Sequence, residues 1–182
     1  SSLISAMFVF NPKFSLSFFH VNITSTVAFS PGCNNFCSYC TIPYIRGRFR
    51  SRKMEDICAE AENLVNAGVK EIILVAQDTA RYGFDIYGKN MLAELTKKLC
   101  KINGLMWIRL LYCYPEHITD ELIEVVKDNQ NICRYFDIPI QHISDKVLKR
   151  MNRKTTGKDI ENIIEKIKTE LPEAVLRTSL IV

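Results

Sequence analysis

The chain has 182 residues, 47% of them apolar, which is enough for one sizeable hydrophobic core and makes a single domain the default. The 24 Lys and Arg residues exceed the 20 Asp and Glu residues only slightly, so charge alone does not indicate a nucleic-acid-binding protein. No stretch reaches the roughly 18 to 20 continuous apolar residues that a membrane-spanning helix requires, so we expect no membrane partner.

Residues 1–26 form an atypical N-terminal segment to which we assign no domain. The segment is rich in phenylalanine, but it lacks the basic start and the unbroken apolar core of a signal peptide. Residues 27–182 show the regular patterning of a folded domain, which we expect to be incomplete at the C-terminus because an apolar run is cut at Val182.

From residue 27 onward, apolar runs typical of strands alternate with amphipathic stretches typical of helices. In chain order, the expected elements are strand 27–30, helix 53–67, strand 70–76, helix 91–102, strand 105–111, helix 119–127, strand 134–138, a short helical turn 145–151, helix 156–169 and strand 174–182. The mostly continuous apolar strands are typical of a parallel sheet covered on both faces. This order predicts an α/β fold whose parallel sheet is open or curled into a partial barrel.

Polar and reactive side chains follow three of these strands directly. Gln77 and Asp78 come after the strand at 70–76, the segment 112–114 follows the next strand, and Gln141 and His142 lie just past the strand at 134–138. Because ligands of α/β proteins bind at the carboxyl ends of the strands, we expect the functional site at this edge of the sheet.

Three of the seven cysteines, Cys33, Cys37 and Cys40, lie within eight residues, separated by three and then two residues. An odd cysteine count with this clustering favours metal binding over a disulfide framework and implies a reducing, cytoplasmic compartment. The thiols could instead pack on one face of a buried helix. Turn-forming residues such as Gly32 and Asn34 in the same stretch favour a loop that wraps around a ligand.

Several metal sites are compatible with three cysteines. Structural zinc normally takes four protein ligands, and no second cysteine pair is present. A ferredoxin-like electron-transfer cluster also takes four, and Cys113 or Cys133 could supply the fourth in space. Three thiolates alone would leave one iron of a cluster open to a small molecule, and an open coordination position is typical of catalytic metal sites.

The cysteine spacing, with the aromatic Tyr39 just before Cys40, resembles that of the radical S-adenosylmethionine (SAM) enzymes. This resemblance implies a 4Fe-4S cluster with three cysteine ligands, whose open iron chelates the amino and carboxylate groups of SAM. Reduction would cleave SAM and release a 5′-deoxyadenosyl radical. The implied fold is a truncated, partial (β/α)6 TIM-like barrel of the radical SAM type over residues 27–182.

Past the cysteines, the chain resembles the radical SAM methylthiotransferases. The resemblance rests on Gly-Cys-Asn-Asn at 32–35, Ile-Pro-Tyr-Ile-Arg-Gly-Arg-Phe-Arg-Ser-Arg at 42–52, Ala-Gln-Asp-Thr at 76–79, Tyr-Gly-Phe-Asp at 82–85 and Arg-Leu-Leu-Tyr-Cys-Tyr-Pro at 109–115. It is greatest with the branch that methylthiolates the β-carbon of an aspartate in a ribosomal small-subunit protein. The sister branch modifies a tRNA adenosine and would carry Gln-Asn at 77–78 and Ser-His-Pro at 113–115. It remains the alternative, beside a non-catalytic iron-sulfur or zinc module.

The resemblance also implies roles for individual residues. Cys33, Cys37 and Cys40 would bind the cluster, with Tyr39 beside them. Gln77 and Asp78 would hold the SAM amino group, although such residues also serve as helix caps or turns. The remaining candidates for SAM or substrate contacts are Gln141, His142 and Arg177.

For these last residues, structural roles remain open. His142 could equally be a histidine satisfied by its own neighbours. Arg177 lies in a buried-looking strand and therefore needs a carboxylate partner, of which the SAM carboxylate is one. The basic run Arg46, Arg48, Arg50, Arg52 and Lys53 fits a solvated surface or a contact to ribosomal RNA or an acidic loop.

The expected partners are the ribosomal substrate and an electron donor such as flavodoxin or ferredoxin. Complete methylthiotransferases carry an N-terminal domain with a second cluster and a small C-terminal β domain, and neither is recognisable in this sequence. We therefore expect the chain alone to bind the cluster and SAM without completing sulfur transfer.

Overall fold

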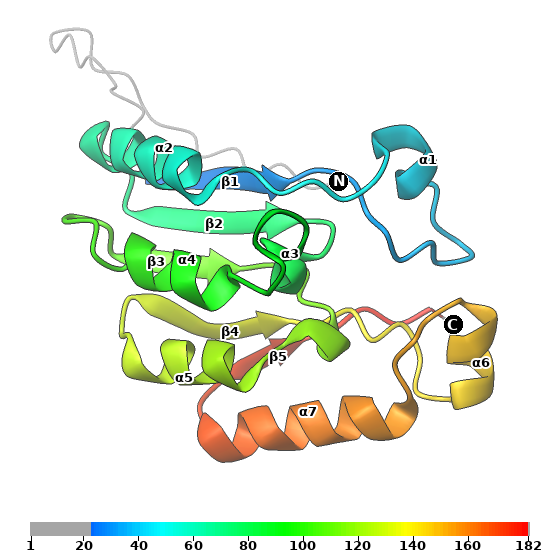
Figure 1. The fold of residues 1–182 in the computed structure, drawn as a ribbon. Helices are drawn as coiled ribbons and strands as arrows, with labels where there is room; N and C mark the ends of the chain where they lie inside the picture. The colour runs from blue at the N-terminus through cyan, green and yellow to red at the C-terminus, as the bar shows by residue number, and fades with distance from the viewer. Residues whose placement is uncertain (1–22, 182) are drawn as a thin grey trace, which may run out of the picture.

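The structure, a computed structural model, describes residues 23–181 and contains a parallel sheet (Figure 1). The five strands lie side by side in chain order, and each pairs with the next in parallel: β1 Thr24–Ser30, β2 Glu71–Ala76, β3 Trp107–Leu110, β4 Ile132–Asp137 and β5 Val175–Arg177. The α/β fold with a parallel sheet is thus confirmed.

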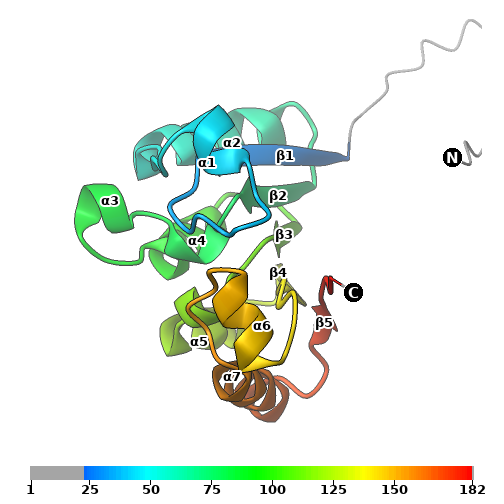
Figure 2. The ribbon, with the colours of Figure 1, turned by 90° about the vertical axis from the view of Figure 1, so that its right-hand side faces the viewer.

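Four helices connect successive strands and cover one face of the sheet: α2 Met54–Asn66, α4 Leu92–Leu99, α5 Asp120–Asp128 and α7 Gly157–Glu170 (Figures 1 and 2). The shorter elements belong to the connections that leave the carboxyl ends of the strands: α1 Ile42–Arg46, α3 Phe84–Tyr87, α6 Asp145–Arg150 and the 3-10 turns Thr79–Arg81 and Pro115–His117. This edge of the sheet therefore carries most of the irregular chain.

Burial alternates along the strands, because successive side chains point to opposite faces. In β2, Ile72 and Leu74 are fully buried under the helices, whereas Ile73 and Val75 on the other face are only half-buried. Within residues 23–181, helices cover only one face, so the expectation of a sheet covered on both faces is wrong for this part of the chain. An uncovered second face is what the inside of a partial barrel presents.

The helices form where amphipathic periodicity predicts them, with ends shifted by a few residues. Thr119 caps α5 by accepting a hydrogen bond from Leu122 N, 3.2 Å away. Thr156 and Asp159 form a reciprocal capping box at the start of α7. These caps satisfy backbone N–H groups that have no partner within the helix.

The strand expected at 174–182 is shorter than predicted. β5 ends at Arg177, and one isolated bridge between Gln141 and Leu180 follows it. Ile138 N still donates to Arg177 O, but the Thr178 hydroxyl then replaces the backbone ladder, because its Oγ1 donates to Ile138 O at 2.8 Å and accepts from Ile140 N at 3.3 Å. None of the helices between residues 23 and 181 combines the length and the apolar character needed to cross a membrane.

Candidate functional site

The cysteine loop, residues 31–41, leaves the end of β1 and turns back against the Arg-Gly-Arg segment, residues 46–48. Cys33 N donates to Gly47 O at 3.2 Å, and Arg50 N donates to Pro31 O at 3.0 Å. Gly32 has a φ of +78°, and a Cβ at this position would lie 2.2 Å from Arg48 O. Only glycine allows two backbone segments to approach this closely.

Hydrogen bonds within and around the loop fix its shape. Asn34 Oδ1 accepts from Phe49 N at 3.1 Å, and Cys40 N donates to Cys37 O at 2.9 Å. The stretch 33–40 contains no helix, so the interpretation of the cysteines as a buried helical face is wrong, as the turn-forming residues predict.

All three cysteines of the loop are free thiols; Cys33 and Cys37 are buried and Cys40 is half-buried. Burial raises the pKa of Cys33 above the ordinary thiol value, and Asp78, Cys37 and Cys40 add to this effect, while a hydrogen bond from Asn35 N works against it. Cys33 is thus disfavoured as a lone thiolate. A bound cation would supply the positive charge that stabilises the thiolates.

No group of three or more His, Cys, Asp or Glu side chains in the described chain is placed to hold a single metal ion. This arrangement does not match a mononuclear zinc site, whose ligands surround one ion. A 4Fe-4S cluster makes a different demand, because each cysteine binds its own iron at a separate corner. Three thiols spread along one closed loop fit that donor pattern.

The two candidates for a fourth cysteine ligand lie in different environments. Cys113 is fully buried and packs within the hydrophobic core. Cys133 lies near the amino end of β4, where Arg109 and Glu71 are its charged neighbours. Since the cysteine loop leaves the carboxyl end of β1 in the same parallel sheet, Cys133 belongs to the opposite edge.

Asp78 joins the cysteine loop to two other connections of the sheet. Its side chain is almost fully buried, and Oδ2 accepts hydrogen bonds from Asn35 Nδ2 at 3.2 Å and His117 Nδ1 at 2.8 Å. The side chain makes no capping bond to the following 3-10 turn. Oδ1 is buried without a hydrogen-bond partner in the described residues, which leaves it able to accept from a ligand.

The segment that follows α6 closes the other side of the loop. Ser38 N donates to Met151 O at 3.0 Å, and Asn152 Nδ2 donates to Phe36 O at 2.8 Å. Next to it, the Tyr114 hydroxyl lies 3.6 Å from Cys37 Sγ. Burial is the main cause that raises the pKa of Tyr114, so the phenol stays protonated.

The remaining predicted residues lie at the same edge in different environments. Gln77 is exposed and lines a cavity of about 380 Å³ together with Pro31, Gly32 and Arg46. Tyr39 is 45% exposed, and its pKa is raised to about 12, mainly by its partial burial and secondly by Cys37.

The backbone of Gln141 and the side chain of His142 each form a hydrogen bond with another part of the chain. Gln141 has a φ of +68°, and its backbone N–H donates to Ser179 O at 2.9 Å. His142 Nδ1 accepts from Ser144 N at 2.9 Å, which agrees with a histidine satisfied by its neighbours.

The prediction that Arg177 lies in a buried strand is wrong. β5 is the edge strand of the described sheet, so the Arg177 side chain is 54% exposed. The expected carboxylate partner exists, however: Arg177 Nη1 lies 2.8 Å from Oδ1 of the buried Asp137. In the basic run, Arg46, Arg48 and Arg50 are exposed.

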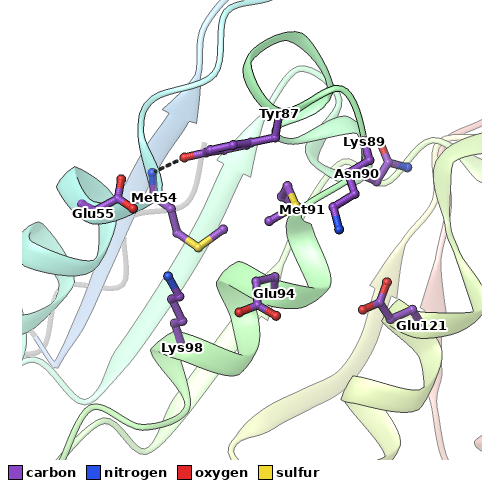
Figure 3. A pocket seen from close by; sticks show the side chains of 9 residues that line it. All are labelled: Met54, Glu55, Tyr87, Lys89, Asn90, Met91, Glu94, Lys98 and Glu121. Atoms are coloured by element: carbon purple, nitrogen blue, oxygen red, sulfur yellow. Dashed lines mark hydrogen bonds between the residues drawn. The ribbon is translucent and has the colours of Figure 1, made fainter.

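A second cavity, of about 240 Å³, lies among α2, α4 and α5 on the helix side of the sheet (Figure 3). Its charged lining residues are Glu55, Lys89, Glu94, Lys98 and Glu121. None of the predicted site residues lines this cavity, so it is separate from the site at the carboxyl edge.

Sequence reasoning missed Asn35, His117 and Arg153 as residues of the site. His117 follows β3 a few residues after Tyr114, so its position past a strand end was an available signal. Arg153 gave no signal, because its contact with the site depends on how the segment after α6 folds back.

A model of the Radical SAM superfamily matches residues 27–182. The chain is 60% identical over 159 residues to the ribosomal protein uS12 methylthiotransferase RimO of Clostridium botulinum (strain Hall), covering 87% of this chain and 36% of that protein. It is 51% identical over 181 residues to RimO of Clostridioides difficile (strain 630), covering 100% of this chain and 41% of that protein. The chain therefore spans about two fifths of the length of these relatives.

Solved structures agree on the fold. The cobalamin-dependent radical enzyme OxsB with SAM bound has a TM-score of 0.68 at 14% identity, covering 86% of this chain and 23% of that chain. The radical SAM methyltransferase TsrM of Kitasatospora setae, with cobalamin and a 4Fe-4S cluster, has a TM-score of 0.63 at 18% identity, covering 86% and 30%. With the family match over residues 27–182, these findings identify the chain as a member of the radical SAM superfamily, whose enzymes use a 4Fe-4S cluster and SAM.

Proposed function

We propose that this chain is the catalytic core of a RimO-type methylthiotransferase, which attaches a methylthio group to the β-carbon of an aspartate in ribosomal protein uS12. The observation that carries the proposal is the closed cysteine loop, packed against the Arg-Gly-Arg segment, in a chain 60% identical to RimO proteins. The segments 76–79 and 109–115, which resemble those of methylthiotransferases, lie at the carboxyl ends of β2 and β3 and contact this loop through Asp78 and Tyr114.

Cys33, Cys37 and Cys40 would hold three irons of the cluster and leave the fourth open, since Cys113 is buried in the hydrophobic core and Cys133 lies near the amino end of β4. When bound, the cluster supplies the electron for reductive cleavage of SAM. The protein's part is to hold the thiolates and to limit access of water to them. The burial of Cys33 and Cys37 supports that role.

SAM would occupy the carboxyl edge beside the loop. The partnerless Oδ1 of Asp78 can accept a hydrogen bond from the SAM amino group, and exposed Gln77 can reach the same group from the rim. Arg177 has an exposed guanidinium with donors beyond the one that Asp137 occupies, which suits a carboxylate.

The finer assignments around SAM follow the position of each side chain. Tyr39 would contribute an exposed ring beside Cys40, and Gln141 and His142 would approach the ribose or the substrate from the end of β4. A one-electron donor such as flavodoxin or ferredoxin would reduce the cluster in the reducing cytoplasm.

Substrate choice is tested with the complete protein that contains this core. The cluster is reconstituted anaerobically, and the protein is incubated with SAM and reductant in the presence of either ribosomal subunits containing uS12 or unmodified tRNA. Mass spectrometry should find a methylthio group on an aspartate-containing uS12 peptide. A methylthioadenosine in tRNA, with unmodified uS12, would instead assign the protein to the sister branch.

A further inference from the structure

A buried arginine from the segment after α6 lies against the cysteine loop. Arg153 is 7% exposed, and its Nη2 donates to Pro139 O at 2.7 Å. Its guanidinium carbon lies 4.1 Å from the centre of the Tyr114 ring. Nε and Nη1 are buried without a hydrogen-bond partner, and Arg153 makes no ion pair within residues 23–181. A buried cation in this state is costly unless an anion compensates it.

The two residues before Arg153 fix its position relative to the cysteines. Asn152 and Met151 bond to the backbone of Phe36 and Ser38, which flank Cys37. Tyr114, whose ring stacks under the guanidinium, places its hydroxyl 3.6 Å from Cys37 Sγ. One phenol ring therefore bridges the buried guanidinium and the central thiol of the loop.

The surroundings keep Arg153 charged. Burial works to lower the pKa of Arg153, but its net direction is upward, and arginine stays protonated in proteins in any case. One-electron reduction adds a negative charge to an iron-sulfur cluster held by thiolates. A fixed positive charge nearby, in surroundings with little water, favours the more negative state.

We propose that Arg153 supplies the compensating positive charge for a cluster held by Cys33, Cys37 and Cys40, and thereby raises the reduction potential of that cluster. This role rests on the proposed function, because it requires the cluster in the loop. The negatively charged cluster with its thiolates would be the anionic partner of Arg153, whose Nε and Nη1 have no hydrogen-bond partner within residues 23–181. Tyr114 holds the guanidinium in place over the loop.

The test compares reconstituted clusters in the complete chain and its variants Arg153→Gln, Arg153→Lys and Arg150→Gln. Iron and sulfide content reports whether the cluster forms, and redox titration followed by electron paramagnetic resonance, without SAM, gives the midpoint potential. Arg153→Gln should lower the equilibrium constant for reduction about tenfold, equivalent to about 59 mV for one electron. Arg153→Lys keeps the charge and should lower it less than threefold. Arg150→Gln removes an exposed charge from α6 and should change nothing.

Glu116→Gln supplies a test in the opposite direction that leaves Arg153 in place. Glu116 is exposed and is one of the charges that act on Arg153, so its neutralisation should shift the midpoint potential upward. A potential unchanged in both Arg153→Gln and Glu116→Gln, with full iron content, would overturn the proposal. If Arg153→Gln does not fold, a downward shift in Glu116→Gln or a loss beyond tenfold in Arg153→Lys overturns it. A parent chain that binds no cluster refutes the proposed function itself.

Discussion

At the scale of single residues, the site depends on close backbone contact and on buried polar contacts between distant segments. Gly32 allows the cysteine loop to touch the backbone at Arg48, and Asp78 bonds the loop to His117. The cysteines could be identified from their spacing, because spacing along the chain is what a local loop preserves. The partners of Asp78 could not, since they lie 43 and 39 residues away.

Gly32→Ala should be far more harmful than Gly47→Ala, although both glycines have nearly the same φ, +78° and +76°. A Cβ at Gly47 would meet nothing within 4 Å, so this change costs only the strain of its backbone conformation, φ +76° and ψ −162°, which is essentially restricted to glycine, about 1–3 kcal/mol. A Cβ at Gly32 would also clash with Arg48 O, adding about 1–3 kcal/mol. Urea unfolding of the metal-free chain measures both, and equal losses would contradict the close approach.

His117→Leu should destabilise the metal-free chain by about 1.5–3 kcal/mol, because the buried Asp78 carboxylate loses its shorter hydrogen bond. His142→Leu is the matched control, since His142 is half-exposed and accepts only from the nearby Ser144 N. The control should change the free energy of unfolding by less than about 0.5 kcal/mol. Indistinguishable values for the two variants would mean that His117 does not support Asp78.

At the scale of elements, the periodicity of the sequence predicted the order of strands and helices because local patterning decides which face of each element is buried. The helix ends followed from capping residues such as Thr119 and Thr156. The prediction failed at 174–182, where β5 ends at Arg177 because the Thr178 hydroxyl bonds to the backbone of Ile138 and Ile140 in place of the ladder. The apolar pattern of a segment does not show that a hydroxyl within it will bond to the neighbouring strand's backbone.

Thr156→Ala should destabilise the fold by about 1 kcal/mol through loss of the capping box that begins α7. Hydrogen bonds from Thr156 lower the pKa of Asp159, so its contribution is present above the ordinary carboxyl pKa and is lost as the pH falls through the lowered value. The difference between parent and variant should therefore shrink in acid. Thermal unfolding from pH 7 to pH 3 measures it, and a constant difference would contradict the pairing with Asp159.

At the scale of the whole molecule, the parallel sheet brings loops from four strand ends to one edge and places the cysteine loop among them (Figure 2). Within the described residues, Asp78 Oδ1 and Arg153 Nε are buried without a hydrogen-bond partner. These two atoms and the uncovered face of the sheet are the places where a ligand would bind. The order of βα units could be read from the sequence. The convergence of Asn35, Asp78, Tyr114 and Arg153 required the folded chain.

The central claim is that the cysteine loop holds a cluster with one open iron that cleaves SAM. The most direct measurement is anaerobic: the chain is reconstituted with iron and sulfide, SAM and dithionite are added, and 5′-deoxyadenosine is measured by mass spectrometry. The parent should form it, whereas Cys37→Ser should form none while keeping its far-ultraviolet circular dichroism, because the core is independent of the loop. A parent with a full 4Fe-4S cluster and no 5′-deoxyadenosine would contradict the claim.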